Sequence, residues 1–146
     1  MANISVLNFV RTKAIFHSKM RYSRERKSFD LLPLADTAHG VYFILDGDDI
    51  LKIGKADGKN GLSGRISTYK ANLSSRKNDH TVNKFYKNML GPLMGKELEM
   101  YIYPLPPKSI EHEGYTLEGQ MTRSLERILS IQAKSENNSM LLSGQD

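Results

Sequence analysis

The sequence predicts a small α/β (α+β) domain in which a three-stranded antiparallel sheet is flanked by helices. Apolar residues alternate with period two in two neighbouring segments, residues 40–45 and 50–55, which a short polar turn separates. A third alternating segment, residues 98–105, ends in a proline-rich run. Apolar residues at helical spacing lie before and after these segments. At 146 residues, the chain has the length of one domain.

The first two strands form a hairpin whose turn, residues 46–49, is rich in Asp and Gly. A loop of three residues would place Tyr42 opposite Gly54. Lys52 would then lie diagonal to Tyr42 on the same face, within reach of a long side chain. A loop of two or four residues would place Tyr42 and Lys52 on opposite faces, because one step of register turns every side chain over. We predict the three-residue loop, and we expect Gly54 to leave room for the backbone of a ligand.

The segment before the hairpin predicts a helix over residues 4–20, since apolar residues recur there at helical spacing. The cationic run 19–27 is either an arm that contacts DNA or the solvated end of that helix. We divide the chain into a basic N-terminal helical extension (1–35), a main domain (36–134) and a polar tail (135–146).

Three helices are predicted after the hairpin. Ser63 can cap the first, which carries Arg65 and Tyr69. A second is predicted over residues 82–90. After the third strand we expect a loop from 108 to 114, and then a helix from about Thr116 to Lys134.

The net charge of +5 is unevenly distributed. Residues 50–96 hold ten Lys and Arg against two acids, whereas residues 97–126 hold six Glu against two cations. A basic region of this kind attracts a phosphodiester backbone, although solubility charge is the alternative explanation. The cations that we expect to contact nucleic acid are Lys55, Lys59, Lys70, Arg76, Lys77, Lys84 and Lys87.

Composition excludes other classes of protein. No apolar run approaches the roughly 20 residues that a membrane-spanning helix needs, and the N-terminus lacks the apolar stretch of a signal peptide. The chain has no cysteine, which excludes disulfides and thiolate metal sites and fits a reducing compartment. We therefore expect a cytoplasmic protein that does not contact a membrane.

Two tripeptides and two later residues resemble a known nuclease family. The Gly-Val-Tyr sequence at 40–42 is followed by Lys-Ile-Gly at 52–54, and then by Arg65 and, one helical turn later, Tyr69. This ordered set resembles the GIY-YIG nuclease superfamily, in the branch that carries Lys in place of the second motif's Tyr (the K-I-G form). The resemblance covers roughly residues 38 to 130.

The resemblance implies a metal-dependent endonuclease that hydrolyses phosphodiester bonds in DNA, with RNA as a further possible substrate. Tyr42 would position or deprotonate the attacking water, and Lys52 would favour its phenolate. Arg65 would pair with the phosphate, and Tyr69 would donate a hydrogen bond to a phosphate oxygen.

The metal ligand implied by the resemblance is a glutamate near the start of the helix that follows the third strand. Glu118 matches that context, beside the apolar stripe of the predicted helix, and would hold one Mg²⁺ or Mn²⁺ ion. The alternative candidates for this metal ligand are Glu111, Glu113 and Glu126. An asparagine that the family often carries after this helix corresponds to Asn137 or Asn138.

Two other classes of function remain open. One is a nucleic-acid-binding module that has the fold but does not cut. The other is an interaction protein of a phage or mobile element, in which the basic surfaces are incidental.

Overall fold

The computed structural model describes residues 4–23, 25–26, 28–34, 38–70, 95–119 and 121–136. Its centre is a five-stranded antiparallel sheet with the strand order β2-β1-β5-β3-β4. Three of these strands are those that the sequence predicts: β3 (Gly40–Asp46), β4 (Asp49–Ala56) and β5 (Leu98–Pro104). The predicted fold class is therefore confirmed, and two further strands extend the sheet.

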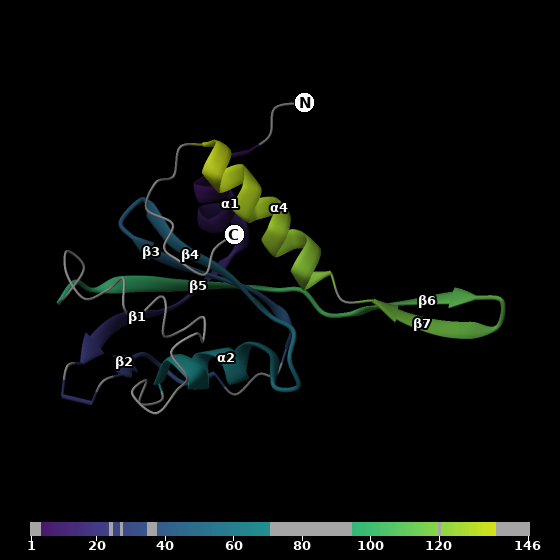
Figure 1. Ribbon diagram of the computed structural model, residues 1–146, viewed down its shortest axis with the longest axis horizontal. Coiled ribbons are helices and arrows are strands. Elements are labelled where there is room, and N and C mark those ends of the chain that lie inside the picture. The colour runs from purple at the N-terminus through teal and green to yellow at the C-terminus, as the bar shows by residue number, and fades with distance from the viewer. Residues whose placement is uncertain are drawn as a thin grey trace.

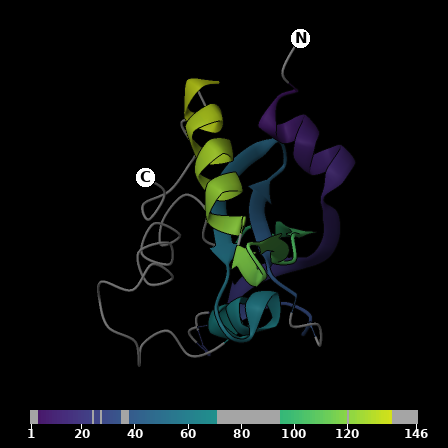
Figure 2. The same cartoon turned by 90° about the vertical axis from the view of Figure 1, so that its right-hand side faces the viewer.

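Helices cover both faces of the sheet (Figures 1 and 2). α2 (Gly61–Lys70) lies on one face, whereas α1 (Val6–Lys13) and α4 (Thr122–Ser135) lie on the other. A separate apolar core fills each side. The α2 side includes Met20, Phe29, Tyr42, Ile66 and Tyr69. The opposite side includes Val10, Phe43, Ile53, Leu129 and Ala133. No helix in the described part of the chain is long and apolar enough to cross a membrane.

The N-terminal segment corrects the prediction of a helix over residues 4–20. α1 ends at Lys13, and the chain continues as β1 (Ile15–Ser23) and β2 (Ser28–Asp30). β1 pairs with β5, and its side chains from 18 to 22 are alternately buried and exposed. The cations of this segment hid its period-two pattern, because they occupy the exposed positions. These residues thus belong to the central sheet, and the run from 19 is not the end of a helix.

The hairpin has the predicted register at the site but a different turn. The turn has two residues, 47–48, and a β-bulge leaves Leu51 without a partner in β3. The bulge adds the odd residue that the loop does not supply, so the side chains keep the predicted faces. The pairs expected near the site, Tyr42 with Gly54 and Ile44 with Lys52, are both present.

The segment before α4 is a strand pair, which corrects a second prediction. β6 (Lys108–His112) and β7 (Tyr115–Gly119) pair across a turn in which Glu113 and Gly114 have φ of 50° and 81°. α4 begins at Thr122, six residues later than expected. Leu117 lies four residues before Met121 and therefore mimics a helical stripe, but it sits on a strand. The predicted helix over 82–90 and most of the predicted tail lie outside the described residues.

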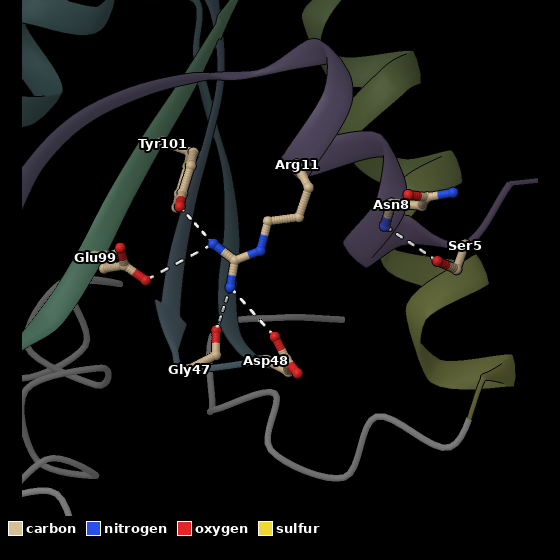
Figure 3. A network of polar contacts seen from close by, with 7 residues as sticks. All are labelled: Ser5, Asn8, Arg11, Gly47, Asp48, Glu99 and Tyr101. Atoms are coloured by element: carbon tan, nitrogen blue, oxygen red, sulfur yellow. Dashed lines mark hydrogen bonds and ion pairs between the residues drawn. The ribbon is translucent and has the colours of Figure 1, made fainter.

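Arg11 ties α1 to the sheet (Figure 3). Its guanidinium donates to the Tyr101 hydroxyl, to the Gly47 carbonyl at 2.9 Å and to Asp48 at 3.3 Å. It also lies 3.8 Å from a Glu99 carboxylate oxygen. One side chain thus joins α1 to β5 and to the turn between β3 and β4.

We expect Arg11→Ala to lower the free energy of unfolding by about 1–2 kcal/mol, because several hydrogen bonds to one charged group are lost. Denaturant unfolding measures this effect. Lys13→Ala, at an exposed position near the end of the same helix, should change stability by less than about 0.5 kcal/mol. Equal effects from the two substitutions would contradict the special role of Arg11.

Candidate catalytic site

Four of the predicted site residues come from three elements, two strands and a helix. Tyr42 lies on β3 and Lys52 on β4, whereas Arg65 and Tyr69 lie one turn apart on α2. The hydroxyls of Tyr42 and Tyr69 are 3.1 Å apart, and their rings pack edge to face with centroids 5.8 Å apart. Lys52 is 2% exposed, and the pairing register places it on the same sheet face as Tyr42. The structure therefore places Tyr42 and Lys52 on one face of the sheet, the face that α2 covers with Arg65 and Tyr69.

Gly54 fixes the position of the Tyr42 ring. A Cβ atom built at residue 54 would overlap ring atoms and the hydroxyl of Tyr42, so the ring occupies the space that a side chain would fill. The expectation that Gly54 leaves room for a ligand backbone is therefore wrong. The glycine instead lets the ring lie across β4, with its hydroxyl at Tyr69.

We expect Gly54→Ala to destabilise the protein by about 1–3 kcal/mol, because the new methyl group must displace the Tyr42 ring. Alanine is ordinarily more favourable than glycine inside a strand, so destabilisation would report the clash. Gly58→Ala is the matched control, since a Cβ there meets no atom within 4 Å. Thermal unfolding of both variants measures the difference, and a Gly54→Ala protein as stable as the control would contradict the prediction.

Burial and neighbouring charges set the acidity of the two tyrosines. Burial raises the pKa of Tyr42, while the Arg65 charge and a hydrogen bond from Tyr69 lower it. Burial raises the pKa of Tyr69 well above its usual value, and the adjacent Tyr42 raises it further. Either hydroxyl can be the donor of the hydrogen bond that the two tyrosines share. Burial is the largest cause of the pKa shift of both tyrosines, and Arg65 lowers the pKa of each.

Glu126, one of the three alternative candidates for the metal ligand, affects the pKa of Tyr42. Its carboxylate raises the pKa of Tyr42. Glu126 is half-buried on α4 and accepts a hydrogen bond from the Ser130 hydroxyl at 3.5 Å. Glu126 thus lies on the helix that follows the β6–β7 pair, two turns later in the sequence than Glu118.

Glu118 was predicted as the metal ligand because it was expected near the start of a helix, but it does not lie on a helix. It lies on β7, exposed, opposite Ser109. Glu111 and Glu113 belong to the same exposed hairpin. Both Glu118 and Glu126 directly follow a leucine, so the local sequence pattern alone does not distinguish them. Among the described residues, no three His, Asp or Glu side chains cluster closely enough to share a metal ion.

A cleft of about 240 Å³ opens where β4 leads into α2. Lys59 is exposed at this cleft, and the half-buried Arg65 also lines it. Three glycines contribute backbone without side chains, which lets a phosphate approach the chain closely. The remaining lining residues, with these glycines, are Ala56, Gly58, Asn60, Gly61, Gly64 and Thr68.

The other cations that we expected to contact nucleic acid have different surroundings. Lys55 lies 3.4 Å from the Asp57 carboxylate, and Lys70 donates to the Leu31 carbonyl at 2.8 Å. Lys59 is thus the described member of the predicted set that lines the cleft. Arg76, Lys77, Lys84 and Lys87 lie outside the described residues, as do Asn137 and Asn138.

Solved structures share this fold, among them two that match over most of this chain, although no protein-family model and no curated protein matches the chain. One is a glutamate-to-alanine mutant of bacteriophage T4 EndoII, with a TM-score of 0.63 and 18% sequence identity over 85% of this chain and 88% of that chain. The other is the restriction endonuclease Hpy188I in complex with product DNA, with a TM-score of 0.51 and 14% identity over 94% of this chain and 93% of that chain. At these identities, the similarity establishes the fold.

Proposed function

We propose that this chain is a metal-dependent endonuclease of the GIY-YIG type, in its K-I-G form, that hydrolyses phosphodiester bonds in DNA. The observation that carries the proposal is the buried hydroxyl pair of Tyr42 and Tyr69, with Arg65 lowering the pKa of both. The fold supports it, because one similar structure is a restriction endonuclease bound to product DNA.

The cleft beside Arg65 is the proposed site for the scissile phosphate. The planar guanidinium can pair with two phosphate oxygens, and Lys59 adds positive charge at the same cleft. The backbone of the glycine-rich loop from Gly58 to Gly61 also lines this cleft and can approach the DNA strand. The substrate would then lie across the end of β4 and the start of α2, next to the tyrosine pair.

Tyr42 is the proposed general base. It would accept a proton from the attacking water as a phenolate, whose negative charge Arg65 and Lys52 would stabilise. Tyr69 would hold the Tyr42 oxygen in place through their hydrogen bond. Because burial raises the pKa of Tyr42, cleavage should become faster as the pH rises toward that pKa.

Glu126 is the proposed metal ligand in place of Glu118. A single half-buried carboxylate fits a Mg²⁺ or Mn²⁺ ion, because such an ion takes its other ligands from water and phosphate oxygens. When bound, the ion would stabilise charge that develops on the phosphate and the leaving oxygen. Glu126 would hold it on the side of the site that faces α4.

Nicking of supercoiled plasmid with Mg²⁺ or Mn²⁺, and with a chelator, tests this proposal directly. Cleavage that the chelator abolishes is the expected result. A salt-dependent gel shift without cleavage would contradict the proposed endonuclease activity and favour a nucleic-acid-binding module of the same fold. The absence of both shift and cleavage would favour the interaction protein.

A further inference from the structure

Three exposed cations follow one side of α4. Arg123, Arg127 and Lys134 lie at spacings that the helical repeat brings into one line, here called the α4 stripe. At about 1.5 Å of rise per residue, the stripe is roughly 16 Å long. It therefore has the length of about five phosphates of one DNA strand, which advance by about 3.4 Å of axis each.

The α4 stripe borders the polar edge of the buried face of this helix. Glu126 and Ser130 form that edge and are joined by a hydrogen bond of 3.5 Å. Arg123 lies three residues before Glu126, and Arg127 lies three residues before Ser130, so each arginine neighbours a member of the edge on the helix surface. The first turn of α4 is the end nearer α2, and later turns lie farther away (Figures 1 and 2). The stripe thus begins beside the proposed metal ligand and leads away from it.

Among the described residues, no acid neutralises the α4 stripe. Its three side chains have no hydrogen bond or ion pair within that part of the chain. The carboxylate of Glu136, at the end of α4, instead accepts hydrogen bonds from the Val6 backbone and the Gln132 side chain. Cations elsewhere in the described structure do pair with carboxylates, namely Arg11, Lys19, Arg21, Arg26, Lys55 and Lys96. The charge of the stripe is therefore free to meet an anionic partner.

The stability of α4 does not explain the position of Arg123. This arginine lies in the first turn, where the helix dipole is positive and a cation is unfavourable. The first turn holds no acid, and the N-cap residue Met121 makes no side-chain hydrogen bond to it. Lys134, by contrast, lies in the last turn, where a cation is favourable. A residue that conflicts with local stability is typical of a functional surface.

We propose that the α4 stripe binds the phosphate backbone of duplex DNA beside the cleavage site. The inference rests on the proposed endonuclease function and adds a DNA-binding surface to it. Arg123 would contact the phosphates nearest the metal ion, and Arg127 and Lys134 would contact phosphates farther along the strand. Each contact would release counterions from the DNA, so the stripe would contribute to affinity at low salt.

An anionic membrane is the alternative partner for this helix. Ile128 and Ile131 are 60% and 56% exposed on α4, and cations beside apolar residues suit a membrane surface. The position of the stripe favours DNA, because it adjoins the polar edge that contains Glu126. A strand whose scissile phosphate reaches Glu126 would pass along the stripe.

Fluorescence anisotropy with a labelled DNA duplex, in chelator and over a range of salt concentrations, tests the contact. Arg123→Gln/Arg127→Gln should weaken binding at least about tenfold and make the slope of log affinity against log salt shallower by about two, since each lost phosphate contact removes about 0.9. Lys13→Gln/Lys108→Gln removes the same charge from exposed positions on α1 and β6 and should change the slope by less than about 0.5. Equal changes in the two variants would overturn the proposal, and thermal unfolding verifies that both fold.

Disulfide trapping locates the contact, because the natural chain has no cysteine. Arg127→Cys should cross-link to a duplex that carries a thiol on a backbone phosphate, whereas Lys13→Cys should not. If neither variant cross-links, or both do so equally, the proposal is wrong. So it is if Arg123→Gln/Arg127→Gln abolishes binding to phosphatidylserine vesicles and leaves DNA binding unchanged, because the partner would then be a membrane.

Cleavage kinetics separate this inference from the proposed function on which it rests. Arg123→Gln/Arg127→Gln should raise KM about tenfold and leave kcat within about threefold, as expected when binding common to substrate and transition state is lost. A chain that cuts DNA, with a double variant of unchanged affinity, would contradict the α4 contact alone. A chain that binds DNA through the stripe and never cuts would support the contact and contradict the endonuclease.

Discussion

Glu126→Gln should lower the rate of Mg²⁺-dependent plasmid cleavage by about 10³-fold or more, because the amide removes the charge that holds the metal ion. Folding should be preserved, since Gln matches Glu in size and the side chain is only half-buried. DNA binding in the presence of a chelator should also be unchanged. Single-turnover cleavage, gel shift and thermal unfolding measure these three properties.

Glu118→Gln is the matched control for that experiment. Glu118 is exposed on β7, and its register partner is Ser109. We expect this variant to cleave at the normal rate. If Glu118→Gln is inactive and Glu126→Gln is active, the metal ligand is on β7 and the assignment to α4 is wrong.

Tyr42→Phe should lower the cleavage rate by about 10²–10⁴-fold at every pH, because it removes the proposed base while the ring stays packed over Gly54. In the unmodified protein, the rate should rise with pH, since the active form of Tyr42 is deprotonated and burial raises its pKa. The variant should lose this rise. Tyr103→Phe, on the opposite side of the sheet, should keep both the rate and the profile.

Tyr69→Phe and Lys52→Met should shift the pH profile of cleavage without removing the base. Tyr69 lowers the pKa of Tyr42 through its hydrogen bond, so its loss should move the rise to higher pH. Lys52→Met should move it in the same direction by removing a nearby positive charge. In a background that already carries Tyr42→Phe, each change should have little further effect, because the residues act as a unit. Additive losses with an unshifted profile would mean that the base is another group.

Short-range patterns were sufficient for the part of the fold that carries the tyrosine pair. Period-two alternation located β3, β4 and β5, whereas Tyr42 and Lys52 share a face because a β-bulge that the sequence did not predict makes up for the shorter turn. Helical spacing placed Arg65 one turn before Tyr69 on α2. The strand and helix positions depend on neighbours within a few residues or across one hairpin, so the sequence expresses them directly.

Tertiary packing decided the remaining features. β1 was hidden because a strand whose exposed positions carry Lys and Arg resembles a polar helix end, and its pairing with β5 spans most of the chain. The role of Gly54 depends on the ring of Tyr42, which lies on the neighbouring strand β3. Glu126 and Glu118 have the same local pattern, and only the tertiary structure separates the half-buried acid on α4, which raises the pKa of Tyr42, from the exposed acid on β7. Contacts between distant segments determine such choices, and periodicity carries no information about them.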